Sequence, residues 1–125
     1  METTSNKKKI LILDKNGRML SALDAITYFG NFDVHLIYDP NAIYDKAKAL
    51  NPDLIILDYL IPDNDCALIC QDFKDDDRLK GIPIIILTTF KTKKAQENAY
   101  NCDALFIKPL DMELLASRME YLIAS

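Results

Sequence analysis

The stretch LIILDYLIPDND, residues 54–65, contains four apolar residues that lead directly into a single carboxylate, Asp58. A proline, Pro62, follows four positions later. A short continuous apolar run closed by turn-forming residues is typical of a strand that is covered on both faces. One interpretation is that the strand simply reaches the surface at Asp58 and a turn begins. The other is that Asp58 is a chemical group presented at the end of a sheet.

Four further apolar runs have the same character, at residues 10–13, 34–38, 84–87 and 104–107. Between the runs, apolar residues recur at the spacing of one helix face. The clearest stripes are Met19, Leu23 and Ile26; Ile43, Ala47 and Leu50; Cys66, Ile69, Cys70 and Phe73; and Leu115, Met119 and Leu122. Strands that alternate with helices pair in parallel, with helices on both sheet faces. The sequence therefore predicts an α/β fold, a doubly wound five-stranded parallel sheet of flavodoxin-like (βα)5 type with strand order 2-1-3-4-5.

Length and charge limit the classes of protein to which the chain can belong. Its 125 residues predict one domain with a core at about 8–124, large enough to bury a single hydrophobic centre. A formal net charge of -4 argues against a surface for nucleic acid or anionic membrane. The apolar runs are too short to span a membrane or to form a signal peptide. We therefore expect a cytoplasmic protein that binds neither nucleic acid nor membrane.

The three cysteines are odd in number and follow no disulfide-like pattern, which fits a reducing compartment. Cys66 and Cys70 have the i, i+4 spacing of two metal ligands on one helix face. However, the single histidine, His35, lies within an apolar run, and no other cysteine pair completes a site. We interpret these cysteines as small core residues.

Polar residues stand at the carboxyl ends of four predicted strands: Asp14, Asp58, Thr88 and Lys108. In open parallel α/β sheets, ligands bind beyond these ends, near the point where the strand order reverses. With the predicted order, the four strands are successive neighbours, about 5 Å apart. A polar residue at one strand end is common, but four at one edge form a cluster of carboxylate, hydroxyl and ammonium groups.

The chemistry that fits this cluster is phosphoryl transfer onto a carboxylate. A carboxylate can act as a nucleophile and hold the phosphoryl group as an acyl phosphate. Such a transfer depends mainly on positioning and on neutralising the charge of the phosphoryl oxygens. A lysine supplies a point charge, a threonine hydroxyl supplies a hydrogen bond, and Mg²⁺ held by carboxylates supplies the rest.

Four motifs carry a family resemblance: KKILILDKN at 8–16, PDLIILDYLIP at 52–62, IPIIILTTF at 82–90 and LFIKPL at 105–110. In this order and spacing they resemble the receiver domains of two-component response regulators (CheY-like), including the single-domain chemotaxis regulator. The resemblance covers essentially the whole chain. It implies a regulatory domain and not an enzyme, one that at most assists its own phosphorylation and dephosphorylation.

The resemblance also implies roles for individual residues. Asp58 would be the phosphoacceptor, which receives its phosphoryl group from a histidine kinase or a phosphotransfer protein. Thr88 would be the switch hydroxyl, and Lys108 its ion-pair partner. Asp14, Asp58 and the backbone carbonyl of Leu60 would bind Mg²⁺. A downstream protein partner would contact the face formed by the fourth helix, the fifth strand and the fifth helix.

The first acidic pair departs from the family pattern. The family usually ends its first strand on two adjacent acids, whereas this chain has Asp14 followed by Lys15. In one interpretation Lys15 extends into solvent, and Asp14, Asp58 and the Leu60 carbonyl still bind Mg²⁺ weakly. In the other, its ammonium group replaces the metal and pairs with Asp58. The chain would then be a phosphorylation-independent pseudo-receiver that acts as an interaction module.

Other functional classes fit the motifs less well. A flavin-binding domain of the same fold needs a phosphate loop rich in small residues after the first strand, and DKNGRML does not supply one. An aspartyl phosphatase needs a second acid where this chain has Leu60.

The predicted helix at 91–101 offers mainly alanines toward the sheet, so it is either closely packed or able to shift. A single-domain regulator that acts by protein contact is the simplest interpretation.

Overall fold

The computed structural model describes residues 7–14, 32–58, 64–88, 102–107 and 111–124. At residues 58, 64–67, 88 and 107 it describes the backbone alone. The helices predicted around 19–26 and 91–101 lie outside the described residues. The elements are β1 (Lys8–Asp14), β2 (Phe32–Ile37), η1 (Pro40–Ala42), α2 (Ile43–Leu50), β3 (Leu54–Asp58), α3 (Asn64–Asp75), β4 (Ile84–Thr88), β5 (Ala104–Ile107) and α5 (Met112–Ala124).

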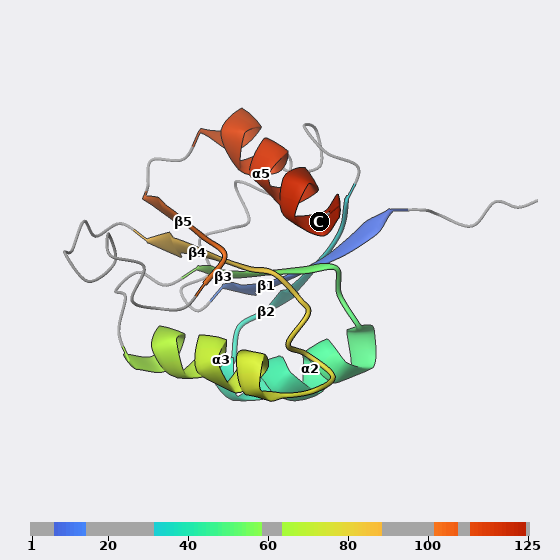
Figure 1. Cartoon of the computed structure of the whole chain (residues 1–125), viewed down its shortest axis with the longest axis vertical. Coiled ribbons are helices and arrows are strands. Elements are labelled where there is room, and N and C mark those ends of the chain that lie inside the picture. Colours follow the sequence, from blue (N-terminus) through green and yellow to red (C-terminus); the bar gives the residue numbers. More distant parts are fainter. Residues whose placement is uncertain (1–6, 15–31, 59–63, 89–101, 108–110, 125) are drawn as a thin grey trace, which may run out of the picture.

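The strands form one parallel sheet in the order β2-β1-β3-β4-β5, which confirms the predicted topology. Figure 1 shows α2 and α3 on one face of the sheet and α5 on the other. Successive side chains of β1 point to opposite faces. Leu11 and Leu13 enter the cluster beneath α2 and α3, whereas Ile10 and Ile12 enter the cluster beneath α5. Because both faces are covered, the strand sequence is continuously apolar.

The second strand begins earlier than predicted. The apolar run predicted a strand at 34–38, but β2 starts at Phe32, which is buried in the cluster beneath α5. Asp33 interrupts the apolar pattern because it is exposed, and its carboxylate lies 3.2 Å from Nε2 of His35. Tyr38 lies outside the strand and is exposed. Residues 34–37 are only partly buried because β2 is an edge strand of the described sheet, less enclosed than β1 or β3.

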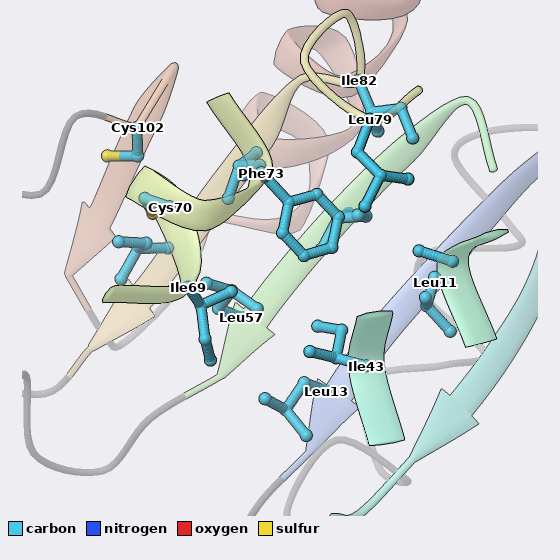
Figure 2. Packing of buried hydrophobic residues seen from close by; sticks show 14 residues of the cluster. Leu11, Leu13, Ile43, Leu57, Ile69, Cys70, Phe73, Leu79, Ile82 and Cys102 are labelled. Carbon is cyan, nitrogen blue, oxygen red and sulfur yellow. The ribbon is translucent and has the colours of Figure 1, made fainter. Parts of the chain in front are cut away.

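Phe73 lies at the centre of the cluster beneath α2 and α3, between α3 and the sheet (Figure 2). Its ring centroid is 5.4 Å from that of Tyr44 on α2. Cys70 and Cys102 belong to the same cluster, and both are free thiols. Burial raises the pKa of Cys70 to about 12, so its thiol stays protonated at neutral pH. The prediction of a core cysteine is therefore confirmed for Cys70.

Asn51 ends α2 in a left-handed conformation, with φ 56° and ψ 59°. Its backbone N–H donates a 2.8 Å hydrogen bond to the carbonyl of Ala47. Residues with a Cβ pay about 1 kcal/mol or more in this region, and asparagine tolerates it better than most. Asn51→Ala should therefore lower the free energy of unfolding by about 1 kcal/mol in urea titrations. Asn51→Gly should lower it by much less, and equal losses would contradict this explanation.

Asp103 joins the starts of β4 and β5. Its carboxylate accepts a 2.7 Å hydrogen bond from the backbone N–H of Ile84, and Lys74 of α3 lies 3.3 Å away. Asp103→Ala would leave the Ile84 N–H without this acceptor, which should cost about 1.5–3 kcal/mol of unfolding free energy. Lys74→Ala removes only the partly exposed ion pair and should cost less than about 1 kcal/mol. Urea denaturation of both variants tests this, and an equal cost would assign the effect to the ion pair.

Candidate functional site

The strand register places the predicted acids side by side at one edge of the sheet. Asp14 is the last residue of β1 and Asp58 the last of β3, and the two are paired residues in the parallel ladder. Both strands end at this point because the apolar runs that hold them in the sheet end there. The expected proximity of Asp14 and Asp58 therefore holds at the level of the backbone.

Thr88 joins this pair from the next strand. Asp58 pairs with Leu87 of β4, so Thr88 lies one residue further along the same edge. Thr88 in turn pairs with Ile107, the last residue of β5 and the one before Lys108. The register thus brings three of the predicted site positions together on successive strands. Lys15, Leu60 and Lys108 lie outside the described residues.

Asp14 is fully buried, and it is the one charged residue in the buried class among the described residues. A carboxylate without water needs charged or hydrogen-bonding partners, since burying it alone is costly. Asp14 does have such an interaction in this structure. A buried acid at a strand end differs from an ordinary solvated turn residue, so it favours the interpretation of this edge as a site.

The residues next to the polar positions of this edge are apolar and fully buried. Leu13, Leu57 and Leu87 precede or neighbour the polar positions on β1, β3 and β4, and all three are fully buried. The polar positions at the edge therefore border directly on the apolar core on both faces of the sheet. Electrostatic interactions in such a place are stronger than in bulk water.

The donor set fits a hard divalent cation better than a softer metal. Among the described residues, no group of three or more His, Cys, Asp or Glu side chains forms a metal site. Asp14 and Asp58 offer two carboxylate positions on adjacent strands. Mg²⁺ is commonly bound through one or two carboxylates and keeps several waters. Two carboxylate positions therefore suit Mg²⁺, and Cys70 plays no part because its thiol is buried in the core.

Comparison with known proteins identifies the family. The chain matches the family model of the response regulator receiver domain over residues 10–120. The chain belongs to this family. The match confirms the resemblance of its motifs to the receiver domains of two-component response regulators. This family is regulatory.

Curated relatives include regulators that are longer than this chain. The response regulator ArlR of Staphylococcus haemolyticus is 30% identical over 112 residues, which cover 88% of this chain and 50% of that protein. The DNA-binding dual master transcriptional regulator RpaA of Synechocystis sp. is 29% identical over 117 residues, which cover 92% of this chain and 48% of that protein. The chain spans about half the length of these relatives. The expectation that it binds no nucleic acid stays a prediction.

Solved structures share the fold. The receiver domain of a sensor histidine kinase from Pseudomonas aeruginosa, with magnesium coordinated in its active-site cleft, has a TM-score of 0.79 and 20% identity, covering 95% of this chain and 99% of that one. A two-component response regulator from Clostridium difficile has a TM-score of 0.77 and 23% identity, covering 94% of this chain and 97% of that one.

None of the helices that the structure describes has the length and apolar character needed to cross a bilayer.

Proposed function

We propose that this receiver domain accepts a phosphoryl group on Asp58 from a histidine kinase or a phosphotransfer protein. The observation that carries the proposal is the register that pairs Asp14 with Asp58 and sets Thr88 one residue beyond, at one sheet edge. The full burial of Asp14 supports it, because it marks this edge as a specialised environment. Residues 8–124 would form the single domain that performs this role, supported by the family match over residues 10–120.

The transfer needs few groups. A carboxylate oxygen of Asp58 forms a bond to phosphorus while the phosphorus–nitrogen bond of a donor phosphohistidine breaks, and the released imidazole takes up a proton. Lys108 would neutralise phosphoryl oxygen charge, and the Thr88 hydroxyl would donate a hydrogen bond to the same group. Asp14, Asp58 and the Leu60 carbonyl would hold Mg²⁺, which supplies further positive charge at the phosphoryl oxygens when bound.

The signal would pass through α5, β5 and the segment between β4 and β5. The described part of this surface carries the exposed side chains of Leu114 and Tyr121, with the Arg118 guanidinium 5.5 Å from the Tyr121 ring centroid. Apolar and cation–aromatic groups of this kind favour contact with a protein. The net charge of -4 likewise supports a protein partner over nucleic acid.

Lys15 supports a second candidate function. Its ammonium group stands next in sequence to Asp14, where the family usually has an acid. If that group pairs with Asp58, it replaces the metal and mimics part of the phosphorylated state of the site. The domain would then bind its partner without a phosphorylation cycle.

Intact mass measured after incubation with acetyl phosphate distinguishes the two functions. We expect a gain of one phosphoryl group that requires Mg²⁺ and disappears in Asp58→Asn, because the amide is not a nucleophile for this reaction. Asp77→Asn is the matched control, since that carboxylate is almost fully exposed in the turn after α3 and should not affect the gain. No gain at high Mg²⁺ in folded protein would reject the phosphoacceptor function in favour of the pseudo-receiver.

A further inference from the structure

The helices α2 and α3 lie on the face of the sheet opposite to α5 (Figure 1). A groove is lined by residues of both helices and of η1. It has a volume of about 390 Å³, within the range of ligand-binding clefts. Its lining residues are Pro40, Asn41, Tyr44, Leu68, Ile69 and Asp72. We call this surface the α2–α3 groove.

A hydrogen bond fixes the two sides of the groove. The Tyr44 hydroxyl of α2 donates to the Asp72 carboxylate of α3 over 2.9 Å. Burial, with a further contribution from Asp72, raises the pKa of Tyr44, so its hydroxyl remains a donor at neutral pH. The ring of Tyr44 also packs against that of Phe73 in the core. The groove is therefore a preformed feature of the helix pair.

The groove combines a buried floor with an exposed apolar rim. Ile69 is almost fully buried, whereas the neighbouring Leu68 is 57% exposed. Tyr38, two residues before Pro40, is also exposed. The other large exposed hydrophobic residues of the described ranges, Leu114 and Tyr121, lie on α5. The exposed leucine on α3 thus lies outside the surface that the proposed function uses.

The described residues of the groove carry a negative charge and no positive charge. Among the described residues that line it, Asp72 is the acidic one and none is basic. Two lysines that follow on these helices are engaged elsewhere, Lys48 with Asp76 at 3.5 Å and Lys74 with Asp103 at 3.3 Å. Lys46 of α2 is exposed and does not line the groove. An apolar group that enters the groove displaces water from the Asp72 carboxylate. That loss is costly unless a cation takes the place of the water.

We propose that the α2–α3 groove is a docking site for a basic amphipathic helix of a partner protein. One apolar side chain of that helix packs against Leu68 and Ile69, and a lysine or arginine next to it pairs with Asp72. Binding of an amphipathic helix in an apolar groove is a common mode of recognition, and the charge pair sets the choice of partner. The groove follows closely on the end of β2, where Ile37 pairs with Leu13, the residue before Asp14. A docked helix would therefore lie close to the sheet edge that carries the site.

A nuclear magnetic resonance titration of the ¹⁵N-labelled full chain tests the proposal. The probe is a synthetic helical peptide of leucine and lysine, and its control has glutamate in place of lysine. We expect saturable shifts confined to residues 40–44 and 68–72 with the lysine peptide alone. Leu68→Ala should weaken binding about tenfold, because an exposed anchor contact is lost.

Two charge variants sharpen the test. Asp72→Asn keeps an acceptor for the Tyr44 hydroxyl and removes the charge, so it should reduce the preference for lysine over glutamate peptide. Asp77→Asn removes the same charge from a 96% exposed carboxylate outside the groove and should leave that preference unchanged. Equal effects of the two variants, shifts centred on α5, or no saturable binding would overturn the proposal. Because the titration uses unphosphorylated protein, its outcome is independent of the chemistry proposed for Asp58.

Discussion

Lys15→Asp is expected to strengthen the binding of Mg²⁺ to this receiver domain by about 10- to 100-fold. The substitution changes the charge next to Asp14 by two units. At an effective dielectric constant near 20, one unit charge at about 4 Å contributes roughly 4 kcal/mol before screening. A quarter of the two-unit total is still about 2 kcal/mol, and each 1.4 kcal/mol corresponds to a tenfold change in affinity.

Calorimetric titration with Mg²⁺ measures this effect directly. Lys15→Gln should produce an intermediate gain because it changes the charge by one unit. Lys80→Asp is the matched control, since Lys80 is exposed in the turn after α3 and precedes β4, away from the strand ends that carry the acids. If Lys15→Asp and Lys80→Asp have the same affinity, the Lys15 ammonium does not act at the metal position and extends into solvent.

Phe73→Ala is expected to lower the free energy of unfolding by about 3–5 kcal/mol. The ring is fully buried and lies at the centre of the cluster beneath α2 and α3 (Figure 2). Its removal forfeits the burial of the ring and leaves a cavity that the surrounding strands cannot fill. Domains of this size are stable by only about 5–15 kcal/mol, so the variant should be partly unfolded in mild denaturant.

Urea denaturation followed by circular dichroism measures this loss. Leu68→Ala is the control on the same helix, because Leu68 is 57% exposed and its truncation should change stability by less than about 0.5 kcal/mol. A loss below about 2 kcal/mol for Phe73→Ala would mean that the cluster relaxes around the missing ring. The Leu68 control also shows that any loss of peptide binding in that variant does not arise from unfolding.

Much of the fold could be predicted from the sequence because buried parallel strands have an unambiguous pattern. The apolar runs at 54–57, 84–87 and 104–107 coincide with β3, β4 and β5 to within one residue. The stripe of Ile69, Cys70 and Phe73 likewise predicted the buried face of α3. The start of β2 was missed because the exposed Asp33 separates Phe32 from the rest of the apolar run. A local pattern detects continuous burial, and it misses the start of an edge strand where an exposed acid interrupts the apolar run.

The gathering of Asp14, Asp58 and Thr88 at one sheet edge could also be predicted from the sequence, because each directly follows an apolar run. The burial of Asp14 could not, because an acid at a strand end looks the same in sequence whether or not neighbouring strands enclose it. The contact between Tyr44 and Asp72 was equally invisible, since the two residues are 28 positions apart and neither stands in a motif.

By itself, the sequence determined the types of the described elements, their order along the chain and the residues that end β1, β3, β4 and β5. These properties follow from periodicity and from turn-forming residues, which act over a few positions. The tertiary structure alone decided the residue-by-residue register of the strand ends, how deeply Asp14 is enclosed and where α2 and α3 leave a groove. Those properties depend on packing between segments distant in the chain, and a local pattern carries no record of that packing.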